Sequence, residues 1–323
     1  MGAMSVACIK TVNDIVTQPT APRARDVMAR VMRPAMPPPD PRLESPSAVL
    51  ECGAAALSAM ERAASVRELL APLSDLVDMF TAADEETTPE VVLNTLKREI
   101  ERLRVIEKRR TVELSQARIK AGQPLPKPHT LAGNETGTDA IRASLPVPIA
   151  ADLVITATQT LSLDNKLKPS ALEPNTAYTY GEQVYVTDGR SRPAYIRGVL
   201  THIEGKAPRH KWIQRGVGHA GRAAEPAKFG NLIGGHPISV AVGGFPSGPN
   251  LFPQNADMNL SAFSTLETEL RELAAQGVHV EFEIRLAVDN PEDEVPSALL
   301  VTYYIEGEEY DQITLLNEAH QLK

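Results

Sequence analysis

The sequence predicts an α+β protein, in which an α-helical N-terminal region precedes a C-terminal domain built on an antiparallel sheet. Apolar residues recur at helical spacing up to about residue 120, whereas short segments rich in β-branched and aromatic residues follow residue 150. Prolines concentrate near the start of the chain and again between these two parts. Four segments are therefore predicted: a largely extended proline-rich arm over residues 1–46, a helical region over 47–122, a linker over 123–150 and a C-terminal domain over 151–323.

Three amphipathic helices are predicted in the helical region. The first two cover residues 47–60 and 64–80, and the third runs from a cap at Thr88 to about Lys120. Basic and acidic residues are interleaved along the third helix. This pattern favours a solvated helix face, and a contact with nucleic acid is the alternative.

Strands are predicted in the C-terminal domain over residues 153–158, 177–187, 194–203, 279–288, 299–305 and 312–315. The segment 279–288 alternates most clearly between apolar and polar residues. One helix is predicted between the early and late strands, from Ser261 to Gln276, with Gly277 ending it.

Composition excludes several classes of protein. The two cysteines have no metal-like spacing, and no apolar run is long enough to span a membrane. The first 16 residues lack the pattern of a secretory signal. The net charge of −8 argues against broad, nonspecific adhesion to nucleic acid, although a small basic cleft is compatible with an acidic protein.

A group of polar residues in the C-terminal domain has the composition of a hydrolytic site. Asn259, Glu267 and Arg271 are spaced to share one face of a helix, and His236 follows two glycines. Oxygen ligands bind a hard divalent cation, a guanidinium neutralises phosphate, and a neutral imidazole can take a proton from water. The structural alternative is that Asn259 caps the helix while Glu267 and Arg271 form an ordinary ion pair. His219, also flanked by glycines, competes with His236 for the role of base.

The order of motifs in this region resembles that of the DNA/RNA non-specific endonucleases, a group of ββα-metal nucleases that includes many tips of bacterial toxins. The resemblance covers about residues 160–318. It is carried by Gly235-His236, Gly243-Gly244, Asn250-Leu251-Phe252-Pro253-Gln254, Asn259, Ala262-Phe263 and Leu266-Glu267, with a lead-in at Gly205–Arg209 and Gly221-Arg222.

The resemblance implies a ββα-metal motif on one face of the sheet and a role for each matching residue. His236 would be the general base, Asn259 the direct metal ligand and Glu267 a carboxylate that holds metal-bound water. Arg271 would stabilise the transition state, while Asn250, Gln254 and Arg222 would support the site. The implied cofactor is a single Mg²⁺, for which Mn²⁺ is an expected substitute.

The sequence departs from the family pattern around the histidine. The acidic residue and arginine that usually precede it are replaced by Ile233, Gly234 and Gly235, and Pro237 follows it. A second register places Asn231 where the base belongs, which would make the protein a degenerate nuclease.

The resulting expectation is a Mg²⁺-dependent endonuclease that hydrolyses DNA with little sequence preference, with RNA as a further candidate substrate. Its partners would be a cognate immunity protein and, for residues 1–120, a delivery apparatus or chaperone. We expect a bacterial toxin effector that is made in the cytoplasm, exported without a cleaved signal peptide and active in the cytoplasm of a target cell. The alternative is a catalytically degenerate pseudonuclease that acts as a binding protein.

Overall fold

The computed structural model describes residues 40–83, 88–124, 138, 141, 153–205, 209–224, 230–260 and 262–318. The chain forms two compact units, residues 1–114 and residues 115–323. Most of the predicted proline-rich arm and most of the predicted linker lie outside the described residues. No helix in the described ranges is long and apolar enough to cross a membrane.

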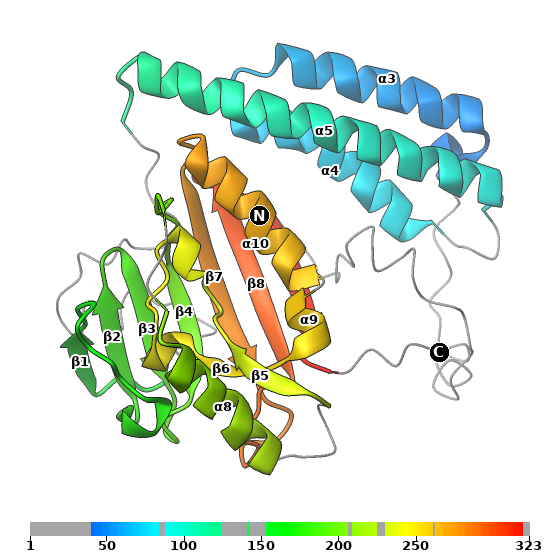
Figure 1. Cartoon of the computed structure of the whole chain (residues 1–323). Coiled ribbons are helices and arrows are strands. Elements are labelled where there is room, and N and C mark those ends of the chain that lie inside the picture. Colours follow the sequence, from blue (N-terminus) through cyan, green and yellow to red (C-terminus); the bar gives the residue numbers. More distant parts are fainter. Residues whose placement is uncertain are drawn as a thin grey trace. The chain divides into compact units, whose positions relative to one another are not determined.

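The first unit is helical. Its elements are the short 3-10 helix η2 (Pro41–Leu43), α3 (Pro46–Arg62), α4 (Val66–Ala82) and most of α5 (Glu90–Lys120) (Figure 1). Ser45 and Ser65 cap α3 and α4 by accepting hydrogen bonds from the backbone of the first turn. Apolar side chains of all three helices, including Met60, Leu69 and Leu96, are fully buried together. The three predicted helices are confirmed, with ends shifted by a few residues.

The second unit contains a seven-stranded sheet with the strand order β1-β2-β3-β4-β7-β8-β9. The strands are β1 (Ala157–Thr160), β2 (Thr176–Tyr180), β3 (Gln183–Thr187), β4 (Pro193–Val199), β7 (Val280–Ala287), β8 (Ala298–Ile305) and β9 (Glu308–Leu316). All neighbouring pairs are antiparallel except β1 and β2, which are parallel. The sheet is therefore mostly antiparallel, as predicted, with one parallel pair that the prediction did not include.

The predicted strand over residues 177–187 is in fact two strands. Tyr180 of β2 pairs with Gln183 of β3 across a two-residue turn at Gly181 and Glu182. Residues on both sides of the turn are equally rich in β-branched and aromatic types, so composition alone did not mark the reversal.

One face of the sheet is covered by α10 (Ala262–Ala275), which crosses β7 and β8 (Figure 1). The apolar stripe of this helix is buried, as are the alternate side chains of β7 that include Phe282 and Ile284. The apolar residues that recur every 3.6 residues in the helix and every two residues in the strand thus lie in one core. The prediction that Leu266, Leu270 and Leu273 pack on the sheet is confirmed.

A two-stranded antiparallel hairpin precedes α10. It consists of β5 (Leu232–Gly235) and β6 (Phe252–Asn255), and the short helix α9 (Ala256–Leu260) follows directly. The sequence predicted one helix here, but Asn255 caps α9 with its side-chain oxygen, which accepts from Asp257 N at 2.8 Å and Met258 N at 3.2 Å. Asn259 therefore lies within α9 and does not open α10. The order strand, strand, helix is that of the predicted ββα motif.

Helix α8 (Lys211–Ala224) was not predicted from the sequence. Its glycines lower helix propensity, but they allow the helix to lie directly against β5. A Cβ atom added at Gly218 would lie 2.7 Å from the Ile233 Cα atom, so the backbones meet without an intervening side chain. Packing thus outweighs intrinsic propensity in α8.

Two alanine substitutions in α8 test this account. Gly218→Ala should lower the free energy of unfolding by about 1–3 kcal/mol, the usual cost of overpacking, because a backbone atom of β5 cannot move aside cheaply. Gly216→Ala, whose added Cβ would meet nothing within 4 Å, should be neutral or stabilising by up to about 1 kcal/mol. Urea unfolding of both variants checks the difference, and equal stabilities would contradict the close packing.

Candidate functional site

His236 lies immediately after β5, at the start of the loop that joins the two strands of the hairpin. The preceding residue, Gly235, pairs with Phe252 of β6. A Cβ atom added at Gly235 would lie 1.7 Å from the Gln254 Oε1 atom, so a larger residue there would displace the buried Gln254 side chain. The close approach of the two strands leaves the His236 side chain buried, with 8% of its surface exposed.

The His236 ring is held in a form suited to accept a proton. Burial lowers its pKa to about 4, because the charged form is poorly solvated, and the positive charges of Arg209 and His210 act in the same direction. A hydrogen bond to the Pro246 carbonyl opposes this shift in pKa. Nε2 is buried and has no partner among the described residues, so the nitrogen that donates to Pro246 is Nδ1. The ring is therefore neutral at pH 7, with an unprotonated Nε2.

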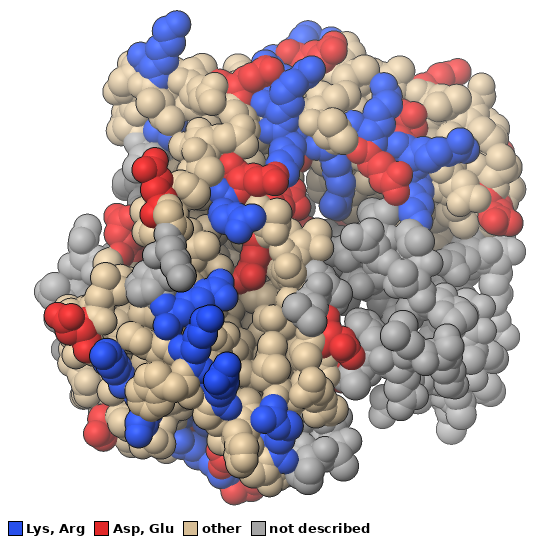
Figure 2. Space-filling view, viewed as in Figure 1, with Lys and Arg blue, Asp and Glu red and all other residues tan. Residues whose placement is uncertain are grey.

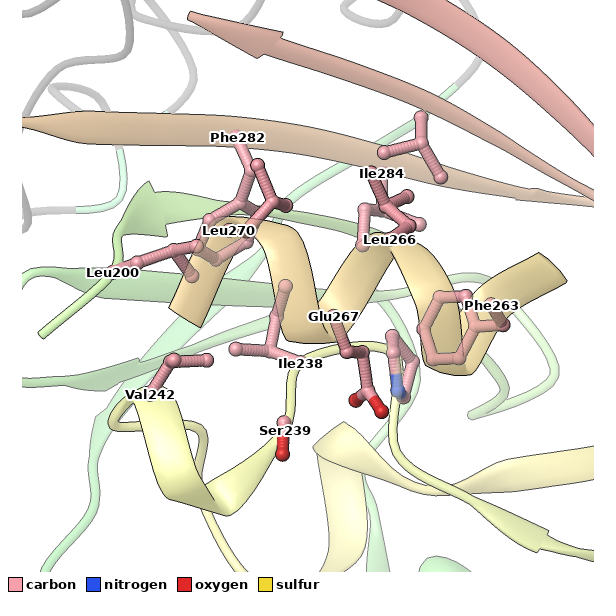
Figure 3. A pocket seen from close by; sticks show the side chains of 12 residues that line it. Leu200, Ile238, Ser239, Val242, Phe263, Leu266, Glu267, Leu270, Phe282 and Ile284 are labelled. Atoms are coloured by element: carbon pink, nitrogen blue, oxygen red, sulfur yellow. The ribbon is translucent and has the colours of Figure 1, made fainter. Parts of the chain in front are cut away.

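Glu267 lies on α10 beside a small cavity of about 30 Å³. Figure 3 shows its carboxyl group pointing away from Leu266 and Leu270 and towards the part of the cavity where Ser239 lies. Burial raises the pKa of Glu267 to about 7, although the charges of Arg209 and Arg271 and a hydrogen bond from Ser239 pull this pKa down. A carboxylate held in such an environment gains stability from any added cation.

Two site residues were missed in the sequence. Arg209 is exposed, yet its charge acts on both His236 and Glu267, which places it beside the two buried groups. Ser239 hydrogen bonds to Glu267. Arg209 was noticed only within the lead-in of the family resemblance, and Ser239 has no motif that would have indicated it.

The loop that begins at His236 is fixed by Asn250. Its Oδ1 atom accepts from Ile238 N at 3.0 Å, and its Nδ2 atom donates to the carbonyl oxygens of Ile238 and Phe245, both at 2.8 Å. Asn250 is fully buried. Gln254 is also fully buried, and neither amide atom of its side chain has a partner in the described part of the chain.

The other predicted residues differ in how they are placed relative to His236 and Glu267. Arg271 is exposed one turn after Glu267 and acts on its charge. Asn259 is half-buried in α9. Asn231 is exposed at the other end of β5, His219 is exposed on α8, and Arg222 on α8 donates to the Leu232 carbonyl oxygen. None of these last three approaches His236 through a contact in the described residues.

Asn259 on α9 and Glu267 on α10 carry oxygen donors of the kind that a hard divalent cation takes. The described residues contain no group of three or more His, Cys, Asp or Glu side chains placed to bind a metal. Asn259 and Glu267 instead offer an amide and a carboxylate oxygen. Mg²⁺ is commonly bound through one or two such ligands, with water filling its other positions.

A neutral buried imidazole, a buried carboxyl group and two nearby guanidinium groups on a ββα motif are compatible with a phosphodiester hydrolase. Residues 174–307 match the model of the family described as DNA/RNA non-specific endonuclease. This match confirms, for that part of the chain, the family resemblance predicted from the sequence.

Solved structures similar to the chain include nucleases with and without metal. The crystal structure of NucA from Streptococcus agalactiae with magnesium ion bound is 16% identical, with a TM-score of 0.35, over 48% of this chain and 76% of that chain. The same protein with no metal bound is 19% identical, with a TM-score of 0.33, over 50% and 77% of the two chains. The Sda1 nuclease with bound zinc ion is 16% identical, with a TM-score of 0.33, over 44% and 76%. No curated protein matches the chain.

Proposed function

We propose that the C-terminal domain is a Mg²⁺-dependent endonuclease that hydrolyses DNA phosphodiesters with little sequence preference, with RNA as a second substrate to be tested. The observation that carries this proposal is the buried Nε2 atom of a neutral His236, which has no partner among the described residues, together with a buried Glu267 that feels the same charge of Arg209. A general base must be unprotonated at the working pH, and His236 meets this condition throughout the neutral range.

In this mechanism His236 takes the proton from the water molecule that attacks phosphorus. The bond from Nδ1 to Pro246 fixes the ring and keeps the accepting lone pair on Nε2. Arg209 and Arg271 place positive charge near the phosphate, where negative charge grows in the transition state. When bound by Asn259 and Glu267, a divalent cation supplies Lewis-acid chemistry that polarises the phosphate.

The family resemblance also motivates a biological role. We propose that the chain is an antibacterial toxin effector, exported from its producer and active in the cytoplasm of a target cell. An immunity protein would then block the site, and residues 1–120 would bind a delivery apparatus or a chaperone. The acidic chain, with a net charge of −8, favours an inhibitor that relies on apolar contacts as well as on carboxylates that mimic phosphate.

Cleavage of supercoiled plasmid tests the enzymatic proposal. The full chain should nick plasmid in Mg²⁺, and EDTA should abolish the reaction. Asn259→Ala should raise the Mg²⁺ concentration needed for half-maximal rate by about 10-fold or more, because an oxygen ligand is lost. Glu267→Ala should act in the same direction by about 10- to 100-fold.

Glu269→Ala is the matched control for Glu267→Ala, because Glu269 lies on the same helix but outside the residues that line the cavity. Its metal dependence should equal that of the wild type. An unchanged metal dependence in both Asn259→Ala and Glu267→Ala would contradict the assigned ligands. Absence of nicking in any divalent metal would favour the pseudonuclease alternative.

A further inference from the structure

The outward surface of α8 carries an aromatic and basic stripe that the catalytic mechanism does not use. Its exposed residues, spaced three or four apart along the helix, are Lys211 and Trp212, then Arg215, His219 and Arg222. The opposite side of the helix buries Ile213 and Val217. We call this exposed set the α8 outer face. The helix contains no acidic residue, although the chain as a whole is acidic.

Two basic residues of the α8 outer face have no acidic partner in the part of the chain that the structure describes. Among the residues that the structure describes, no ion pair joins Lys211 or Arg215 to a carboxylate. In Figure 2, Lys and Arg side chains gather over the part of the surface where Figure 1 draws α8. Several arginines elsewhere do pair with acidic neighbours, as Arg110 does with Glu113 on α5. The charge on α8 is therefore available to an anionic partner.

Trp212 adds an aromatic surface to this charge. It is the only tryptophan in the chain, and 54% of it is exposed. The Lys168 Nζ atom lies over its ring, 5.3 Å from the centroid. A tryptophan in contact with a cation, and still half exposed, is suited to stack on a nucleic-acid base.

The position of α8 connects this surface to the candidate site. Arg209, which acts on both His236 and Glu267, lies two residues before the helix begins. Glycines on the inner side hold α8 against β5, the strand that leads to His236. From Trp212 to Arg222 the helix spans roughly 15 Å, the length of about four nucleotides in one strand of a duplex.

We propose that the α8 outer face binds a single-stranded stretch of nucleic acid that continues from the scissile phosphate, with Trp212 stacking on a base and Lys211 and Arg215 contacting phosphates. This inference rests on the proposed nuclease function. Stacking tolerates every base, so the surface provides affinity without sequence preference. Base faces are covered in a duplex, which is why the aromatic residue selects a single strand.

Binding in the absence of cleavage tests the proposal. The full chain in EDTA is titrated with a fluorescently labelled 12-nucleotide oligo(dT), and anisotropy gives the Kd. Trp212→Ala should raise Kd about 10-fold through loss of stacking. Lys211→Gln combined with Arg215→Gln should raise it by a similar factor at 0.1 M salt and reduce the slope of log K against log salt by about 1.4, because two phosphate contacts are lost.

The matched control is Lys97→Gln combined with Arg98→Gln on α5, which removes the same charge elsewhere. Its Kd and salt slope should equal those of the wild type. Oligo(dT) should also quench the fluorescence of Trp212 in the unaltered chain, and a 12-base-pair duplex should quench it less. Circular dichroism of each variant confirms that it is folded.

Equal affinities for the α8 and α5 variants would overturn the proposal, as would equal quenching by duplex. Displacement of oligo(dT) by polyglutamate at equal charge would show that the surface binds any polyanion and would overturn it too. The binding assay contains EDTA and therefore measures binding without cleavage. If binding depends on α8 but the chain does not cut plasmid in Mg²⁺, only the nuclease function is contradicted. Cleavage without any such dependence would contradict the α8 surface alone.

Discussion

His236→Ala should lower the rate of plasmid nicking by about 100-fold or more, while the variant still folds. The substitution removes the buried, unprotonated Nε2 atom of His236, and loss of a general base has this effect on turnover. The measurement is the initial rate of nicking at saturating Mg²⁺ and pH 8, where wild-type His236 is neutral because its pKa is about 4.

His202→Ala is the matched control, since His202 is exposed in the segment after β4. It should nick plasmid at the wild-type rate. If His236→Ala keeps its rate while Asn231→Ala or His219→Ala loses activity, the register that assigns His236 as the base is wrong.

The same variant separates the toxin role from the enzymatic one. Expressed in bacterial cytoplasm, the wild-type chain should stop growth and degrade the nucleoid, and His236→Ala should be tolerated. Equal growth of both strains with intact nucleoids, despite nicking in vitro, would contradict the toxin role but leave the nuclease intact.

Asn250→Ala should lower the free energy of unfolding of the second unit by about 3 kcal/mol or more. Three buried hydrogen bonds are lost, and the N–H and carbonyl groups of Ile238 and the carbonyl of Phe245 are left without this partner. Each buried polar group left unsatisfied costs about 1–3 kcal/mol. Urea unfolding followed by the fluorescence of Trp212, the only tryptophan, reports on this unit without interference from the other.

Asn290→Ala supplies the comparison for that loss. Asn290 is exposed, and its side chain accepts a hydrogen bond from Glu292 N at 3.1 Å. Its removal should change stability by less than about 1 kcal/mol. A small effect of Asn250→Ala would show that the loop beginning at His236 is held by other contacts.

Periodic segments were predictable from the sequence because their pattern and their burial arise from the same geometry. The alternation in β7 and the apolar stripe of α10 are examples, and both elements lie where they were expected. The parallel pairing of β1 was not predictable, since the direction of a partner strand leaves no local pattern. Helix α8 was missed because its stability comes from contact with β5, whereas glycine lowers its own propensity.

The chemistry of the candidate site was predictable only in part. His236 and Glu267 stand in a recognisable order of motifs. In the structure, the charge of Arg209 acts on both side chains. The protonation state of His236 could not be predicted, because it depends on burial and on a carbonyl group ten residues away in sequence.

The two edge strands of the sheet affect the tendency of the protein to aggregate while it folds. An open sheet edge can pair with another chain and start aggregation. The edge strand β1 is only four residues long, and the edge strand β9 carries Glu308, Glu309 and Asp311. A short edge and an acidic edge both discourage pairing between copies. The second unit should therefore refold from urea at high concentration without forming strand-paired aggregates, a useful property for any chain that has to be unfolded and folded again.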